Sequence, residues 1–188
     1  MARQLSTSFS DLVLSASSFY ICYLWYLQGH KMAAAGFGIL GSAAFLGIFR
    51  FAMTNPEGTL IFKCHKFLSF LSAGAGVSLV AMEFCGVYGS VMLANKIAIF
   101  LMIVIGAAAF MPPKMRGVCT QAASGFSMLT ILILCFINKN YYGIIAGLLY
   151  VVSGLLLTGD GILLGFPYVD WLHYVLTAAN FLFLKALK

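Results

Sequence analysis

The chain has 188 residues, of which 62% are hydrophobic and 9% are charged, and its mean hydropathy is +1.01. A soluble domain carries about 25% charged residues to keep its surface hydrated, so this composition excludes a water-soluble globular fold and indicates an integral membrane protein. The net charge of +6 comes from basic residues spread over several loops, which argues against a nucleic-acid-binding stripe.

Seven apolar segments follow one another along the chain, separated by short polar breaks. A bilayer core about 30 Å thick takes roughly 20 helical residues per crossing. The apolar runs are continuous, which favours helices over the alternating pattern of barrel strands. We therefore expect an all-α membrane protein, a single domain over residues 1–188 forming a compact bundle of six or seven transmembrane helices. The predicted crossings are Leu12–Gln28, Met32–Met53, Leu60–Met82, Gly89–Met111, Val118–Ile137, Tyr141–Thr158 and Tyr168–Leu184.

The first apolar segment reads as a retained helix because Asp11 and several serines interrupt the apolar core that a cleaved signal peptide requires. The charges then favour a cytosolic N-terminus by the positive-inside rule. This orientation puts Arg3, Arg50, Lys63, Lys66, Lys114 and Arg116 in the cytosol and only Lys31, Lys96 and Lys139 on the other side. The opposite interface would carry an aromatic belt of Tyr23, Trp25, Tyr26, Tyr88, Tyr141 and Tyr142.

The seventh segment fits this orientation less well than the others. Seven crossings leave Lys185 and Lys188 on the non-cytosolic side, whereas six would return them to the cytosol. The segment is also short, and a thin bilayer such as that of the endoplasmic reticulum accepts a short helix. We expect the endoplasmic reticulum or a related internal membrane.

Most ionisable groups gather at one end of the predicted bundle. Charged groups near membrane depth often mark sites or internal ion pairs. We therefore hypothesise a cytosol-facing pocket between the second, third, sixth and seventh segments, where Arg50, Lys63 and Lys66 bind a lipid headgroup phosphate. The alternative is that these cations are interfacial anchors whose charged ends reach the surface.

Asp160, Asp170 and His173 are the candidate catalytic groups. Asp170 and His173 are three residues apart, so a helix would place them on one face as an acid–base pair. A capping aspartate beside an interfacial histidine explains the same spacing. Glu83 is either an intramembrane polar ligand or the partner of Lys96. The three histidines and the single Cys64–His65 pair do not form a zinc pattern, so no metal or cofactor is expected.

Small residues mark close helix packing. Gly143 and Gly147 form a small-xxx-small pair in the sixth segment, and Gly161 and Gly165 follow in the break after it. Such residues let helices approach closely in lipid. We expect these contacts within the chain and not in a dimer.

Short apolar motifs along the whole chain carry one family resemblance. They are Asp11-Leu-Val-Leu, Ala33-Ala-Ala-Gly-Phe, Thr130-Ile-Leu-Ile, Asn140-Tyr-Tyr-Gly and Ala146-Gly-Leu-Leu. In these motifs the chain is similar to the transmembrane protein 276 family, a resemblance that implies a multi-pass protein and no established activity.

The last forty or so residues carry a second resemblance, in Gly147-Leu-Leu-Tyr-Val-Val-Ser, Asp160 and Phe181-Leu-Phe-Leu-Lys. They resemble the C-terminal end of the YhhN lysoplasmalogenases, although this chain lacks the central Gly-Asp motif of that family.

Three functions are compatible with these features. The first is a non-enzymatic helical bundle of an internal membrane that binds membrane lipids or other membrane proteins, and no nucleic acid. The alternative is a lipid-modifying enzyme of lysoplasmalogenase type that uses Asp160, Asp170 and His173. A small transporter or channel ranks third because the predicted helix centres offer mainly serine, threonine and glycine.

Overall fold

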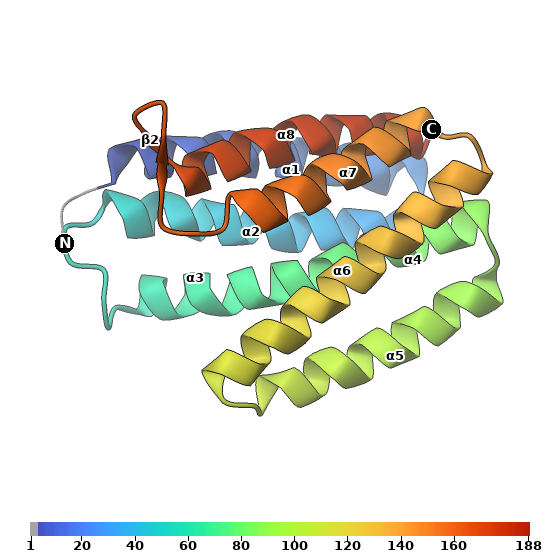
Figure 1. Ribbon diagram of the computed structural model, residues 1–188, viewed down its shortest axis with the longest axis horizontal. Coiled ribbons are helices and arrows are strands. Elements are labelled where there is room, and N and C mark those ends of the chain that lie inside the picture. Colours follow the sequence, from blue (N-terminus) through green and yellow to red (C-terminus); the bar gives the residue numbers. More distant parts are fainter. Residues whose placement is uncertain (1–3) are drawn as a thin grey trace.

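The computed structural model describes residues 4–188 as seven long helical segments side by side in one bundle (Figure 1). This confirms the expected all-α bundle. One segment bends through a π-helical turn, η1, and a short β-hairpin precedes the last helix. The elements are α1 (Leu5–Gln28), α2 (Lys31–Ala52), α3 (Leu60–Leu71), η1 (Ser72–Gly76), α4 (Val77–Tyr88), α5 (Val91–Ala109), α6 (Pro113–Ile137), α7 (Tyr141–Leu156), β1 (Ile162–Leu163), β2 (Phe166–Pro167) and α8 (Tyr168–Ala186).

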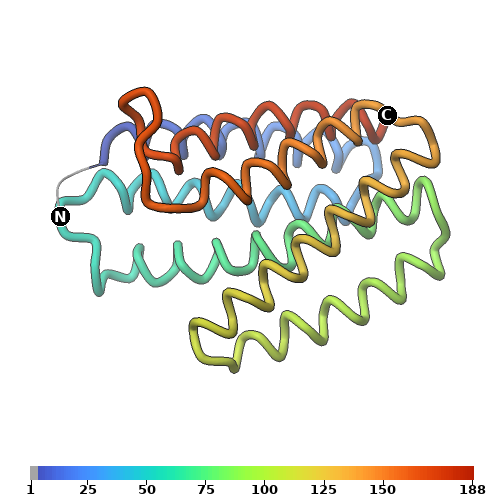
Figure 2. Tube along the Cα trace, in the orientation of Figure 1, coloured from blue at the N-terminus to red at the C-terminus, as the bar shows by residue number. Residues whose placement is uncertain are grey.

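Consecutive helical segments run in opposite directions along the bundle, so that α1 begins at one end of it and α8 finishes at the other (Figure 2). We call the end where α1, α3, α6 and α8 begin the N-terminal end. The seventh predicted segment, α8, runs beside α1 along the bundle. Its 19 residues span about 28 Å at 1.5 Å per residue, which is close to the thickness of a bilayer core.

Six of the segments close into a ring. Helix α1 packs against α2 and α8, α2 against the α3–η1–α4 segment, α4 against α6, α6 against α7, and α7 against α8. Helix α5 lies outside this ring, where it packs against α4 and α6. A ring of this kind leaves an interior that all six segments line.

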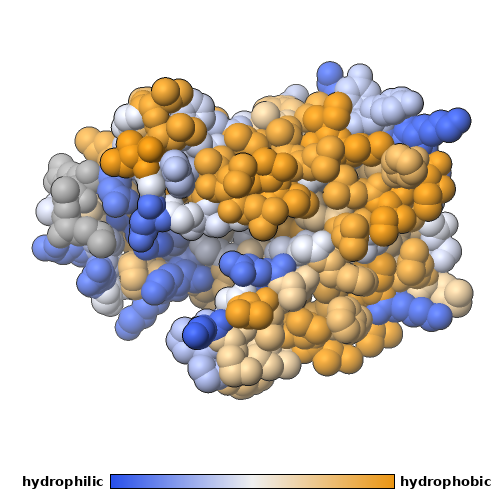
Figure 3. All heavy atoms as spheres, in the orientation of Figure 1, coloured by the Kyte–Doolittle hydropathy of each residue, from blue (hydrophilic) through white to orange (hydrophobic). Residues whose placement is uncertain are grey.

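The outer surface of the bundle is apolar, as a lipid-embedded protein requires. Four segments, α2, α3–α4, α5 and α6, combine the length and hydropathy needed to cross a membrane, and α7 is apolar but shorter. Figure 3 shows apolar residues over most of one face, with hydrophilic residues mainly toward its ends. Helix α1 turns Ser10, Asp11 and Ser18 inward and exposes Phe9 and Tyr20. This polar interior and apolar exterior support the assignment of an integral membrane protein.

Glycines set the closest helix contacts inside the chain. Gly36 of α2 faces the backbone carbonyl of Gly76 in η1, so close that a Cβ atom would overlap it. Gly143 and Gly147 of α7 lie against Cys135 and Leu132 of α6. The predicted small-xxx-small pair therefore packs within the chain, as expected. The second pair belongs to the β-hairpin instead, where Gly165 has a positive φ of 83°.

At the end of the bundle opposite the N-terminal end, two contacts correct predictions made from the sequence. Glu83 pairs with His30 at 3.1 Å and accepts the Met32 N–H at the start of α2, a position where helix dipoles favour an anion. Lys96, its expected partner, is exposed. Trp25 is fully buried against Phe37 and so does not belong to the interfacial belt.

Candidate functional site

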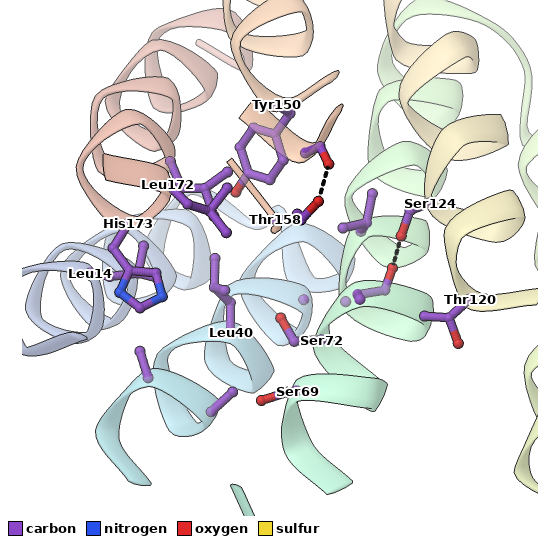
Figure 4. Close-up of a pocket in the computed structure, with 18 of the residues that line it drawn as sticks. Leu14, Leu40, Ser69, Ser72, Thr120, Ser124, Tyr150, Thr158, Leu172 and His173 are labelled. Atoms are coloured by element: carbon purple, nitrogen blue, oxygen red, sulfur yellow. Dashed lines mark hydrogen bonds between the residues drawn. The ribbon is translucent and has the colours of Figure 1, made fainter. Parts of the chain in front are cut away.

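A cavity of about 870 Å³ occupies the interior of the ring (Figure 4). Among the described residues, every helical segment except α5 contributes to its wall. The volume falls within the range of about 300–1,000 Å³ typical of small-molecule sites. A cavity is therefore present between α2, α3, α7 and α8, where the sequence predicts a pocket, and α1 and α6 also line it. That this pocket faces the cytosol stays a prediction.

The body of the cavity is mostly apolar. Phe37 and Leu40 of α2, Val80 of α4, and Leu176 and Phe183 of α8 form much of the wall. Such a surface suits a hydrocarbon chain, because transfer from water to an apolar wall gains about 25 cal/mol per Å² of buried area.

Isolated polar groups also line the cavity on different helices. Figure 4 shows Ser72 and Ser124 among the residues that line the cavity, and Ser124 of α6 donates to the carbonyl oxygen of Ala73 in the π-helical turn. The Tyr150 hydroxyl donates to the Asn180 side chain. These bonds pair the Ser124 and Tyr150 hydroxyls within the protein, so these two groups do not require a polar ligand.

Ionisable groups of α1 and α8 meet at the N-terminal end of the cavity. The Ser10 Oγ lies 2.9 Å from His173 Nδ1 and 3.5 Å from Asp170 Oδ1. Asp11 Oδ1 lies 3.5 Å from the same His173 nitrogen. Ser10 and Asp11 therefore both contact Nδ1 of a ring that lines the cavity. We call Ser10, Asp11, Asp170 and His173 the acidic cluster.

The two carboxyl groups of this cluster are deeply buried. Asp11 is 2% exposed and Asp170 is fully buried. Each has one oxygen with no hydrogen-bond partner among the described residues. Buried polar atoms are nearly always paired in folded proteins, so each of these carboxylate oxygens has room for a partner such as water or a bound molecule. The Asp11 carboxyl also packs against Gly47 of α2, where a Cβ atom would overlap it.

Arg50 provides the positive charge beside the acidic cluster. Its Nη1 lies 2.8 Å from His65 Nδ1, and its guanidinium lies 4.8 Å from the ring centres of Phe51 and Phe62. Asp11 interacts with it electrostatically. Arg50 lines both the main cavity and a smaller cleft of about 190 Å³ at the N-terminal end.

The sequence-predicted site residues separate into two groups in the structure. Arg50 and His173 line the cavity, and Asp170 lies behind His173 in the acidic cluster. Lys63 and Lys66 are exposed; Lys66 lines only the smaller cleft. Asp160 is exposed before β1 and does not line the cavity. The headgroup hypothesis therefore retains Arg50 alone among its three cations, and the acid–base hypothesis retains Asp170 and His173.

Sequence reasoning missed Ser10 and Asp11 as site residues. The sequence does contain a signal for them, because two neighbouring polar residues within an otherwise apolar membrane segment need a polar partner inside the protein. The partner could be identified only from the packing of α1 against α8. Ser10 and His173, which form a hydrogen bond across this contact, are 163 residues apart in the sequence.

The chain matches no protein-family model, no curated protein and no solved structure. The two resemblances described above stay predictions. The functional argument therefore depends on the geometry of the cavity and its polar end.

Proposed function

We propose that this membrane protein binds a single-chain amphiphilic lipid inside the helical ring. The observation that supports this most strongly is the polarity gradient of one cavity, with apolar walls along its body and Arg50, His65 and His173 at its N-terminal end. A ligand with a hydrocarbon chain and an anionic headgroup would match both parts. The guanidinium of Arg50 can make charge-assisted hydrogen bonds to phosphate or carboxylate oxygens.

The cavity volume favours one hydrocarbon chain over two. About 870 Å³ must hold both the headgroup and the apolar part of the ligand, whereas a diacyl lipid needs room for a second chain. Lysophospholipids and free fatty acids are therefore the ligand classes to test first.

Filling the cavity tests this proposal directly. Leu40 points into the cavity from α2 (Figure 4), so Leu40→Trp is expected to weaken binding of a fluorescent lysophospholipid at least tenfold. Phe45→Trp on the same helix is the matched control, because Phe45 is exposed and does not line the cavity. Equal binding by the wild type and both variants in detergent titrations would show that the ligand does not occupy the ring interior.

The acidic cluster favours a second candidate function, hydrolysis of the bound lipid. Ser10 and Asp11 contact the His173 ring at Nδ1, and His173 lines the cavity, so we assign its other ring nitrogen, Nε2, as the general base toward water. Arg50 would then stabilise negative charge that develops on the substrate. This chemistry suits an ester-linked lysolipid and uses Asp11 in place of Asp160 of the predicted residue set. A vinyl ether, the bond that a lysoplasmalogenase cleaves, would first need a proton delivered to its alkenyl carbon, and a carboxyl group of the acidic cluster would have to supply it.

His173→Gln is expected to reduce lysolipid turnover by a factor of 10²–10⁴, the usual contribution of a general base, while leaving lysolipid binding within a few-fold of the wild type. Asp160→Asn is the matched control, because its side chain is exposed and outside the cavity. Product release measured by mass spectrometry over ester- and ether-linked lysolipids would detect the activity. Absence of turnover in the wild type across both classes would leave binding as the function.

We also propose that the N-terminal end of the bundle faces the cytosol. Arg50, Lys63, Lys66, Lys114 and Arg116 all lie at this end, which the positive-inside rule supports; Arg3 lies outside the described residues. An internal membrane such as the endoplasmic reticulum, and contacts with other membrane proteins, stay predictions from the sequence.

A further inference from the structure

The cavity has exposed residues in one part of its wall. Gln121 and Gly125 of α6, and Gly154 and Leu155 of α7, line the cavity and are also exposed on the outer surface. Figure 3 shows a hollow between α7 and the N-terminal half of α6, with hydrophilic residues near its rim. We call this opening, defined by these four residues, the α6–α7 gap.

Two glycines of the gap have no role in close packing. A Cβ atom added at Gly125 or Gly154 would meet nothing within 4 Å. By contrast, Gly143 and Gly147 lie directly against side chains of α6. Glycine destabilises a helix interior relative to alanine, and neither of these glycines gains a close helix contact in return. Because both positions border the gap, a large side chain at either of them would extend into open space and narrow it.

The N-terminal end of the cavity offers a much less favourable route for a hydrocarbon chain. Arg50 lies there between the rings of Phe51 and Phe62, bonded to His65. The buried carboxyl groups of Asp11 and Asp170 lie close by. A hydrocarbon chain entering from water would have to pass these charged groups. The α6–α7 gap instead leads sideways out of the bundle between Gly125, Gly154 and Leu155, with the uncharged Gln121 as its polar member.

We infer that the amphiphile reaches the cavity laterally from the bilayer through the α6–α7 gap. This inference rests on the proposed lipid-binding function and specifies the source of the ligand. The gap lies in the first half of α6 and the last turn of α7, which is the half of the bundle nearer to the acidic cluster. A lipid of that leaflet can therefore keep its headgroup at interfacial depth near Arg50 while its chain passes between the helices.

Narrowing the gap tests the route by its effect on rates. Wild type and variants are reconstituted in nanodiscs, and entry and exit of a fluorescent lysophospholipid carried by the bilayer are followed by stopped flow. We expect Gly154→Phe, and independently Gly125→Phe, to slow entry and exit by the same factor of at least ten. Gly106→Phe is the matched control, because Gly106 lies in α5, also has open space around it and does not line the cavity.

A variant at the N-terminal end tests the alternative route, in which the lipid enters the cavity from water. Met53 lines the smaller cleft at the N-terminal end, so Met53→Trp would obstruct entry from water and is expected to leave both rates unaltered. Slowing by Met53→Trp together with unchanged rates in both glycine variants would overturn lateral entry. An absence of lysophospholipid binding by the wild type would instead overturn the proposed function, so the two failures are distinguishable.

Discussion

Gly36→Ala is expected to lower the free energy of unfolding by about 2 kcal/mol or more, near the upper range for overpacking a tight contact. The added Cβ would overlap the carbonyl oxygen of Gly76, and a backbone atom cannot rotate away as a side chain can. Helix α2 and the π-helical turn would have to separate, which would also distort the cavity wall that both line. The expected decrease in Tm is roughly 4–8 °C for a chain of this size, measured by thermal unfolding in detergent.

Gly38→Ala provides the matched control on the same helix. Its added Cβ would lie 3.6 Å from the Cys22 Sγ, an ordinary contact distance. Because alanine favours a helix interior over glycine by about 0.5–1 kcal/mol, Gly38→Ala is expected to keep or slightly raise the Tm. Similar Tm values for the two variants would contradict the close approach of α2 to η1.

Arg50→Met is expected to weaken binding of a lysophospholipid or fatty acid by about 10- to 100-fold. A hydrogen bond to a charged group contributes about 1.5–3 kcal/mol, and each 1.4 kcal/mol changes a dissociation constant tenfold. Methionine keeps an unbranched side chain beside Phe51 and Phe62 but removes the charge. Binding of an uncharged monoacylglycerol should change by less than threefold. Fluorescence titration of both ligand classes in one detergent measures this difference.

The control for Arg50→Met is Lys63→Met, which removes an exposed cation from the same end of the bundle. It should leave the affinity for both ligand classes within about twofold, since exposed charges are screened by water and salt. Equal weakening of the charged and uncharged ligands by Arg50→Met would show that Arg50 acts through packing and not by binding an anionic headgroup.

The helices could be predicted because their signal is local. Each apolar run is long enough to indicate a helix, and the seven predicted segments coincide with the observed ones to within a few residues at most ends. The Asp170–His173 pair was equally local, since a spacing of three places two residues on one helix face. The charge pattern alone could not predict that Lys63 and Lys66 are exposed and do not line the cavity. At about 100° per residue, Lys63 lies nearly opposite His65, which faces Arg50.

The remaining site residues depend on contacts between distant helices. Asp11 joins His173 only because α1 packs beside α8, and Glu83 pairs with His30 because α4 lies beside the start of α2. No residue pattern in one helix specifies which polar group of another helix will face it. The closed ring itself, and therefore the cavity, also depends on this order of packing.

Native mass spectrometry of the purified protein, released gently from detergent, tests most directly whether the ring interior holds one amphiphile. The wild type is expected to carry a single adduct with the mass of a single-chain lipid, and Leu40→Trp is expected to lose it while Phe45→Trp retains it. An adduct-free wild type after addition of lysophospholipids and fatty acids, or equal adducts on all three proteins, would contradict lipid binding in the cavity.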